Sequence, residues 1–295
     1  MQDLLPEFKG YLQKNKNASA STLDSYLRDV SQFTESFTAL RIKNIAVVEK
    51  TDIEKYIKIL NEKGRSDSTV TRNIASIRCY FGFLESIGKI NNNPAKNVKL
   101  KKVIKKMPEI LTSKEIDLLL SQPDKFLPKG IRDAAMLELL YATGIRVSEL
   151  IEINVSDINL SGGVLICRSQ SSSRIIPIYE EAIASIAKYV KNARNLMSTD
   201  NSGQALFVNM NGSRLTRQGF WKIIKKYSLE AGIKKDITPH TLRHSFALHL
   251  LENGAQLKDI QEMLGHTDIA STQIYAAMLN DRFKSVYNKF HPKAK

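Results

Sequence analysis

The sequence has few cysteines and no long apolar run. Only two of its 295 residues are cysteine, Cys79 and Cys167, which is too few for a disulfide framework or a cysteine-based zinc site. No stretch approaches the roughly 18 apolar residues that a membrane span requires, so we exclude a transmembrane protein. The first residues, MQDLLPEFKG, lack the basic and apolar regions of a secretory signal. We therefore expect a cytoplasmic protein in a reducing environment, with no membrane contact.

Several catalytic motifs are also missing. The chain has no Gly-rich phosphate loop, no HExxH, no CxxC pair and no GxSxG. Reactions driven by a bound nucleotide, zinc hydrolysis and serine hydrolysis therefore have no support in this sequence. We expect neither a metal nor an organic cofactor.

Positive charge, in contrast, is abundant. Lysine and arginine total 44 against 30 aspartate and glutamate residues, which gives a formal net charge of +14. This favours a long anionic partner such as a nucleic acid, because each neutralised phosphate releases counterions and strengthens binding. A lysine-rich surface that serves only solubility is the alternative.

The length fits two domains. Residues 1–95 carry four apolar patterns at helical spacing, which predict a small helical bundle. Ser21 is the expected N-cap of the second helix, and the third and fourth helices end at Gly64 and near Gly88. Residues 96–108 follow as a basic linker, either solvated or lying along DNA phosphates as a strap. Its candidate DNA contacts are Lys99, Lys101, Lys102, Lys105 and Lys106.

Residues 109–295 predict the second domain. A capping box of Thr112 with Glu115 begins its first helix. Helical patterns then cover residues 131–141, 180–194, 216–231, 241–251, 257–264 and 269–278. The β-rich runs 164–167 and 174–178 predict a hairpin. The expected fold is mainly α with a small antiparallel β-sheet.

Arg146 is the first candidate functional residue. It stands at a turn between two apolar helical segments, just after Gly144. A guanidinium is costly to bury there without a partner. One interpretation is an internal ion pair with Glu149, and the other is an anion clamp, because arginine can bind two phosphate oxygens at once.

The segment TPHTLRHSFALHLL predicts an anion site at a helix N-terminus. Its Thr-Pro pair suits the N-cap and the first helical turn. His240 and Arg243 are three residues apart and share one face, where backbone N–H groups favour an anion. His244 and His249 follow among apolar residues, and we expect them to pack or to support neighbouring groups.

Two further residues have value only in combination with these. His266 follows Gly265 at a helix junction, and Tyr275 lies nine residues later inside the last predicted helix. A single histidine or tyrosine in such a place is typical of a structural residue. A set of five such polar residues in this order is not typical of residues with a purely structural role.

Together these residues resemble the signature of the tyrosine site-specific recombinases. Arg146 lies in ATGIRVSEL, His240 and Arg243 lie in TPHTLRHSFA, and His266 and Tyr275 lie in LGHTDIASTQIY. The similarity covers essentially the whole chain. The RVSEL, FALHLL and LGHTD segments are similar to those of the bacterial Xer recombinases, closer to XerD-like members than to integrases with an arm-binding domain.

The resemblance implies a two-domain DNA clamp, with an N-terminal SAM-like core-binding bundle and a tyrosine recombinase catalytic domain. It implies that Tyr275 attacks a DNA phosphodiester and forms a 3′-phosphotyrosine, which conserves the bond so that no ATP is needed. Arg146, Arg243 and His266 would offset the growing charge on the phosphoryl oxygens. His240 would accept or relay the tyrosine proton.

One position departs from the family's pattern. Family members place a lysine in the hairpin to protonate the departing 5′-oxygen, whereas this chain has CRSQSSSRIIPIY there. By register Gln170 occupies the place of the lysine, and Arg174 is a further candidate DNA contact. Glutamine cannot donate a proton as an acid. We therefore expect strand cleavage to be slow or to need an activating partner, and a degenerate hairpin is the alternative.

The resemblance also implies partners and a role. It implies a homo- or hetero-tetramer on two double-stranded DNA sites, strand exchange through a Holliday junction, and docking of residues 281–295 on a neighbouring protomer. The family role is chromosome or plasmid dimer resolution, hence chromosome partition during cell division, with a XerC-like recombinase and an FtsK-type translocase. The alternatives are DNA integration by a mobile element, a type IB topoisomerase-like activity, and site-specific DNA binding with impaired catalysis.

Overall fold

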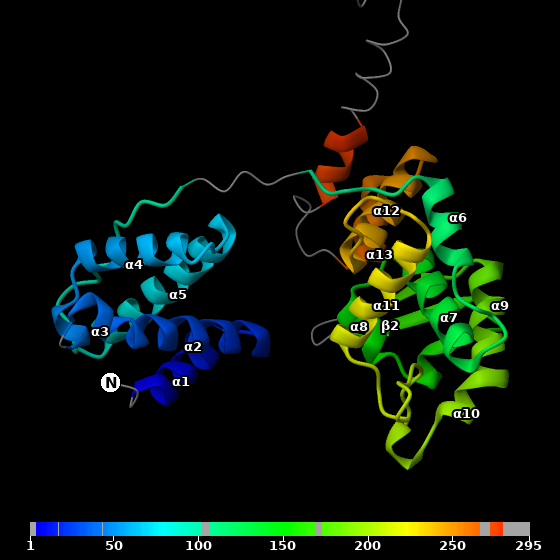
Figure 1. The fold of residues 1–295 in the computed structure, drawn as a ribbon, viewed down its shortest axis with the longest axis horizontal. Coiled ribbons are helices and arrows are strands. Elements are labelled where there is room, and N and C mark those ends of the chain that lie inside the picture. Colours follow the sequence, from blue (N-terminus) through cyan, green and yellow to red (C-terminus); the bar gives the residue numbers. More distant parts are fainter. Residues whose placement is uncertain are drawn as a thin grey trace, which may run out of the picture. The chain divides into compact units, whose positions relative to one another are not determined.

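The computed structural model describes residues 4–16, 18–42, 44–101, 107–168, 173–265 and 272–279. The chain divides into two compact units, residues 1–106 and 107–295 (Figure 1). Within the described ranges no helix has both the length and the apolar character needed to cross a membrane.

The first unit is a helical bundle. Its elements are α1 (Leu5–Lys16), α2 (Ala20–Glu35), α3 (Phe37–Leu40), the 3₁₀ turn η2 (Ile45–Val47), α4 (Lys50–Glu62) and α5 (Asp67–Ser86). The four predicted helices are confirmed, and the structure adds the short α3 and η2. Phe33 packs edge-on against Phe37 in the aromatic centre of the core. The predicted cap of α2 is wrong by two residues: Ser19, rather than Ser21, accepts a bond from the Thr22 N–H at 3.3 Å.

A buried carboxylate links α2 to α5. Asp29 is 1% exposed and accepts hydrogen bonds from Asn73 at 3.0 Å and from Ser76 at 2.8 Å. Arg72 forms an ion pair with the same carboxylate. A buried charge is costly unless it is both paired and hydrogen-bonded, and Asp29 has partners of both kinds.

The chain after α5 stays packed on the first unit as far as Leu100. Ala95 and Val98 are buried in the core of this unit, and Arg78 donates to their carbonyl oxygens at 3.0 and 3.2 Å. The first residues of the predicted linker, 96–108, are therefore part of this folded unit. Lys99 and Lys101 are exposed, and Lys102, Lys105 and Lys106 lie outside the described residues.

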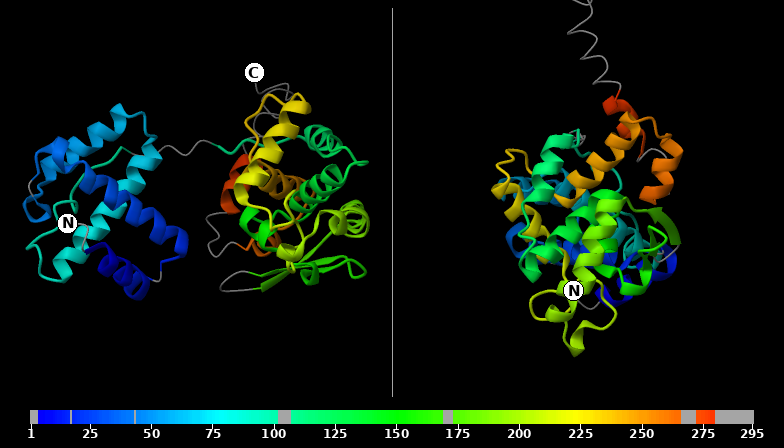
Figure 2. Two further views of the ribbon diagram at one scale, coloured as in Figure 1. Left: turned by 60° about the horizontal axis from the view of Figure 1, so that its bottom comes forward. Right: turned by 90° about the vertical axis from the view of Figure 1, so that its right-hand side faces the viewer.

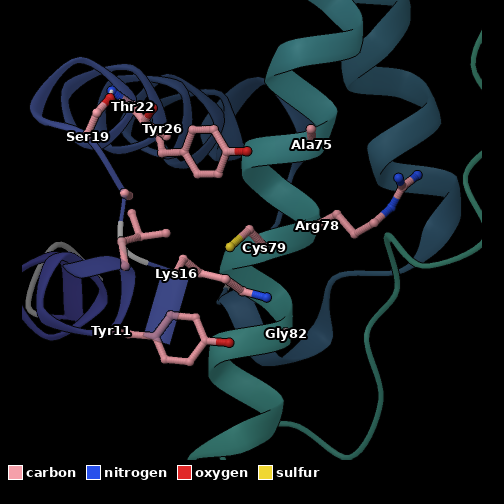
Figure 3. Close-up of a pocket in the computed structure, with 11 residues that line it drawn as sticks. Tyr11, Lys16, Ser19, Thr22, Tyr26, Ala75, Arg78, Cys79 and Gly82 are labelled. Carbon is pink, nitrogen blue, oxygen red and sulfur yellow. Dashed lines mark hydrogen bonds between the residues drawn. The ribbon is translucent and has the colours of Figure 1, made fainter. Parts of the chain in front are cut away.

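A cavity of about 630 Å³ lies among α1, α2 and α5 (Figure 3). Its wall includes Tyr11 and Tyr26 together with Lys16, Arg78 and Cys79. Burial raises the pKa of the Cys79 thiol, so the thiol stays protonated at neutral pH. This cavity belongs to the first unit, whereas every predicted catalytic residue lies in the second unit.

The second unit is built around α7, which is buried along most of its length and packs against α9 and α12. Its helices and turns are α6 (Ser113–Ser121), α7 (Pro128–Thr143), α8 (Val147–Glu152), η3 (Val155–Asp157), α9 (Glu180–Tyr189), η4 (Val190–Arg194), α10 (Asn195–Met197), η5 (Asp200–Ser202), α11 (Arg217–Glu230), α12 (Pro239–Glu252) and α13 (Leu257–Leu264). Residues 272–279 form a further helix. The predicted helix 180–194 is α-helical as far as Tyr189 and continues from Val190 to Arg194 as the π-helical turn η4.

The strands of this unit form one small antiparallel sheet. They are β1 (Ile158–Asn159), β2 (Val164–Arg168) and β3 (Ser173–Pro177), in the order β1-β2-β3. Leu165 lies opposite Ile176, and Cys167 lies opposite Arg174. Figure 2 shows this sheet beside the helices of the unit. The predicted hairpin and the predicted fold class, mainly α with a small antiparallel sheet, are confirmed.

Helix ends determine where the candidate functional residues lie. Thr112 and Glu115 form the predicted capping box at the start of α6, and Thr238 caps α12 through a bond from the Thr241 N–H at 3.3 Å. Gly144 ends α7 in the left-handed conformation, with φ 58°. A Cβ on Gly144 would lie 2.3 Å from a ring carbon of Phe246, so only glycine lets the end of α7 approach α12 this closely.

Candidate active site

Arg243 lies at the centre of the candidate site, on α12. Its side chain is buried, and it donates to the carbonyl oxygen of Gly144 at 2.6 Å and to that of Leu264 at 2.8 Å. It therefore links the end of α7 to the end of α13. Burial and the positive charge of Arg146 lower the pKa of Arg243 to about 10. The guanidinium remains charged at neutral pH.

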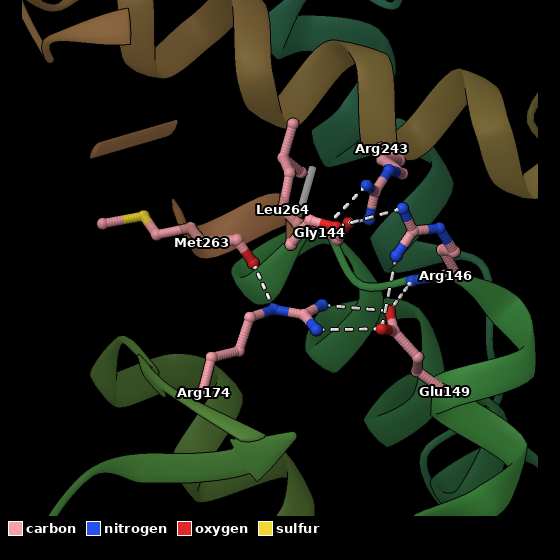
Figure 4. A network of polar contacts seen from close by, with 8 residues as sticks. Gly144, Arg146, Glu149, Arg174, Arg243, Met263 and Leu264 are labelled. Atoms are coloured by element: carbon pink, nitrogen blue, oxygen red, sulfur yellow. Dashed lines mark hydrogen bonds and ion pairs between the residues drawn. The ribbon is translucent and has the colours of Figure 1, made fainter. Parts of the chain in front are cut away.

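Arg146 lies at the N-cap position of α8. Its backbone N–H donates to Glu149 at 2.7 Å, and its guanidinium contacts the same carboxylate at 3.4 Å. The internal ion pair, one of the two predicted alternatives, is thus present. The side chain is nevertheless 41% exposed, so a phosphate can still reach it. Its Nη2 also donates to the carbonyl oxygen of Gly265 at 3.3 Å (Figure 4).

Glu149 is shared between two arginines. Arg174 of β3 donates to its two carboxylate oxygens at 2.9 and 3.0 Å. Burial acts to raise the pKa of Glu149, but the bonds from Arg174 and from the Arg146 amide outweigh it and hold that pKa below its usual value. The side chain of Arg174 is only 10% exposed. Its predicted contact with DNA is therefore not supported by its position, because the guanidinium faces Glu149 inside the unit.

Tyr275 lies in the helix 272–279 and is 1% exposed. Its hydroxyl is 2.9 Å from Nδ1 of His244 on α12. Burial lowers the pKa of His244 to about 4, followed in importance by the charges of His240 and Arg243. The His244 ring is therefore neutral at neutral pH, and the tautomer of this ring sets whether Nδ1 or the phenol donates in their shared hydrogen bond. Burial raises the pKa of Tyr275, and the charge of Arg243 opposes this.

His240 is next to this pair. It lies one helical turn before His244, with ring centroids 6.4 Å apart. Burial lowers its pKa, and the charges of Arg243 and Arg146 lower it further. The structure therefore brings Arg146, His240, Arg243 and Tyr275 into one electrostatically coupled group.

His266 and Gln170, which were predicted for the catalytic site and its hairpin, lie outside the described residues. Arg168, at the end of β2 and two residues before Gln170, has its guanidinium 3.3 Å from Asp157. His244 makes a contact with Tyr275 that the sequence does not predict, because its pattern indicates only a packing or supporting residue. Its spacing of four residues from His240 places both rings on one helix face, and that spacing was the available signal.

The chemical capacity of this group is that of an anion site with a nucleophile beside it. Backbone carbonyls and one carboxylate hold two guanidiniums in place, and the charge of one of them, Arg243, acts on the phenol of Tyr275. Within the described parts of the chain, no three His, Cys, Asp or Glu side chains gather as a metal site. Fixed arginines can offset the charge of a phosphoryl group without reorganising during the reaction.

Comparison with known families decides the identity of this arrangement. The model of the phage integrase family matches residues 109–282, and that of the phage integrase N-terminal SAM-like domain matches residues 5–88. The chain belongs to the phage integrase family. It is a tyrosine recombinase, an enzyme that breaks and rejoins DNA strands, and the resemblance inferred from the sequence is confirmed.

Individual relatives are similar in sequence to this recombinase over its full length. The chain is similar to "Tyrosine recombinase XerD" of Oceanobacillus iheyensis, with 45% identity over 98% of each chain. It is also similar to the protein of that name from Listeria innocua, with 41% identity over 100% of each chain. A solved structure of the XerH site-specific recombinase bound to palindromic difH substrate, a post-cleavage complex, has the same fold, with a TM-score of 0.76 and 20% identity, over 98% of this chain and 84% of that one.

Proposed function

We propose that Tyr275 cleaves one strand of a specific DNA site and passes it to a second duplex through a 3′-phosphotyrosine and a Holliday junction. The observation that supports this most directly is the grouping of Tyr275 with Arg146, Arg243 and two histidines in the second unit of a tyrosine recombinase. In the attack the Tyr275 oxygen forms a bond to phosphorus, and the bond from phosphorus to the 5′-oxygen breaks.

Arg146 and Arg243 supply the charge stabilisation. Negative charge grows on the non-bridging phosphoryl oxygens in the transition state, and each well-placed donor is worth about 3–4 kcal/mol there. Arg243 is already fixed by two carbonyl oxygens, which reduces the reorganisation that catalysis would require. We assign His266 a third donor role on the family motif alone.

His240 is the proposed acceptor of the tyrosine proton. Its pKa is lowered by burial, so the ring is neutral and basic at neutral pH. Tyr275 is 1% exposed and bonded to His244, so the phenol must leave this position before it can touch a DNA phosphate. DNA binding would have to supply that movement.

The departing 5′-oxygen lacks an evident acid in this chain. Gln170 stands where the family has a lysine, and glutamine has no acidic proton to give. Arg168 is close by in sequence, but its guanidinium pairs with Asp157 and holds its proton too tightly to act as an acid. We therefore propose that cleavage is slow unless a partner protein or the bound DNA provides the proton.

The biological role we propose is the resolution of chromosome or plasmid dimers in the cytoplasm. Full-length similarity to proteins named XerD supports it. A tetramer on two recombination sites, a XerC-like second recombinase and an FtsK-type translocase would be its partners. The exposed Lys99 and Lys101 would contact DNA phosphates.

A nicked suicide substrate tests the chemistry. The substrate is a duplex recombination site with a nick close to the scissile phosphate, so that the cleaved fragment diffuses away and the covalent complex accumulates. We expect a protein–DNA band on a denaturing gel that Tyr275→Phe abolishes and Tyr141→Phe retains. Tyr141 is a matched control, because its hydroxyl is also 2.9 Å from a histidine Nδ1, that of His249. Tight site binding without any covalent band would instead indicate a DNA-binding protein with impaired catalysis.

A further inference from the structure

Three arginines from three elements bind the C-terminal end of α13. Arg174 donates to the carbonyl oxygen of Met263 at 2.7 Å, Arg243 to that of Leu264 at 2.8 Å, and Arg146 to that of Gly265 at 3.3 Å. Figure 4 shows these side chains converging on this helix end. The carbonyls at a helix C-terminus have no partner within the helix and carry partial negative charge, so cations stabilise them. Two of the three arginines are proposed catalytic residues, and Arg174 is not.

Arg174 makes contacts that only a guanidinium can make together. Nε donates to Met263, Nη1 donates to Glu149 Oε1 at 2.9 Å, and Nη2 donates to Glu149 Oε2 at 3.0 Å. Each oxygen of that carboxylate also accepts a bond from Arg146: Oε1 from its guanidinium and Oε2 from its backbone N–H. Arg174 thus fixes the carboxylate against which Arg146 rests. A lysine is a single point donor and cannot reproduce this fork.

Gly265 makes room for this arrangement. It ends α13 in the left-handed conformation, with φ 62°. A Cβ at this position would lie 2.8 Å from Nη1 of Arg174 and 2.9 Å from the central carbon of its guanidinium. Any side chain here would therefore displace the guanidinium from Glu149 or shift the end of α13.

We propose that Arg174 is a positioning residue for strand cleavage that does not contact DNA itself. It acts through Glu149 on the guanidinium of Arg146 and through Met263 on the end of α13, the segment that leads into His266. Arg174 lies on β3 and is largely buried, and its contacts connect the hairpin to Glu149 and to the end of α13. The proposal rests on the proposed function, because it assigns Arg146 to the scissile phosphate.

The first test is Arg174→Lys on the nicked suicide substrate. We expect cleavage to slow by about tenfold or more, while the Kd for the site and its salt dependence stay as in the unmodified protein. Arg194→Lys is the matched control, because Arg194 also donates to backbone carbonyls, those of Ala205 and Gly203, and should retain cleavage. A substrate with a neutral methylphosphonate at the scissile position needs less charge compensation. Arg174→Lys should therefore lose less activity on it than on the normal phosphate, an effect that general destabilisation would not produce.

Three outcomes would overturn the proposal. Cleavage by Arg174→Lys at the normal rate would remove the positioning role. If the slope of log K against log salt concentration is smaller by about one for Arg174→Lys than for the unmodified protein, Arg174 contacts a phosphate directly. An equal loss on the normal and neutral substrates would indicate a structural role only. If Arg174→Lys does not fold, Gly265→Ala displaces the same guanidinium and should give the same pattern of results.

Hydrogen exchange separates this proposal from the proposed function. If the unmodified protein forms no covalent complex, the proposed function fails, but the contacts of Arg174 can still be tested. Arg174→Lys should then speed amide exchange at Arg146, whose N–H donates to Glu149, and leave exchange within α11 unchanged. Equal protection of the Arg146 amide in both proteins would overturn the proposal.

Discussion

The bond between Tyr275 and His244 leads to a prediction about stability, and the burial of the two partners gives its magnitude. Tyr275 is 1% exposed, so replacing His244 with leucine leaves its hydroxyl without its hydrogen-bond partner, which costs about 1–3 kcal/mol. Tyr275→Phe leaves a His244 ring that is only partly buried, so that change should cost about 1 kcal/mol. The double variant removes both partners. We therefore expect a coupling free energy of about 1 kcal/mol between the two sites.

The assay is urea unfolding followed by the fluorescence of Trp221. This is the one tryptophan of the sequence, and it lies on α11 in the second unit, so its signal reports the unfolding of the unit that contains the site. Four proteins are compared: the unmodified chain, both single variants and the double variant. The pair Tyr141 and His249 serves as a matched control, since its bond is also 2.9 Å but both partners are only partly buried. Its coupling should be smaller.

Additive effects of His244→Leu and Tyr275→Phe, within about 0.3–0.5 kcal/mol, would refute this reasoning. They would mean that the phenol finds water or another partner as soon as His244 is removed. A coupling larger for the control pair than for the active-site pair would be equally damaging, because burial would then not set the size of the effect.

Three further predictions concern the leaving oxygen, the protonation of His244 and the first unit. Gln170→Lys should speed cleavage of the suicide substrate by about tenfold or more, since it restores a general acid; an unchanged rate would show that the leaving oxygen needs none. The free energy of unfolding of the second unit should fall between pH 6.5 and about 4, because the pKa of folded His244 is about 4 and the unfolded state binds more protons there. His244→Leu should flatten that profile, and an unaltered profile would contradict the assignment. Asp29→Ala should destabilise the first unit by about 1–3 kcal/mol, because Asn73 and Ser76 lose a buried acceptor while the partly exposed Arg72 stays solvated. The expected result is an early helical transition by circular dichroism with no change in Trp221 fluorescence; a single coincident transition would argue against it.

Much of the fold could be predicted because its signals are local. Apolar residues at helical spacing locate the helices, and α13 has the same bounds as the predicted helix 257–264. Caps that involve neighbouring residues, such as Thr112 with Glu115, were also correct. The predicted cap of α2 was wrong because the helix begins at Ala20, ahead of the first apolar residue of its pattern, and Ser19 caps it. The π-helical turn after Tyr189 has no signature in the sequence.

The site was predictable as a set of residues but not as a set of contacts. The order and spacing of Arg146, His240, Arg243 and Tyr275 were sufficient to suggest the chemistry. The bond between His244 and Tyr275 joins residues 31 positions apart, and no local rule relates them. For the same reason the sequence suggested Glu149 as a partner of Arg146 but could not show that Arg174, 25 residues away, takes both oxygens of that carboxylate.

The measurement that tests the central claim most directly is a structure of this protein on a nicked recombination site before cleavage. Arg146 and Arg243 should both lie within hydrogen-bond distance of the non-bridging oxygens of one phosphate. The Tyr275 hydroxyl should have left His244 and lie about 3–3.5 Å from that phosphorus. Guanidiniums that contact two different phosphates, or a Tyr275 still bonded to His244 with DNA fully seated, would contradict the account.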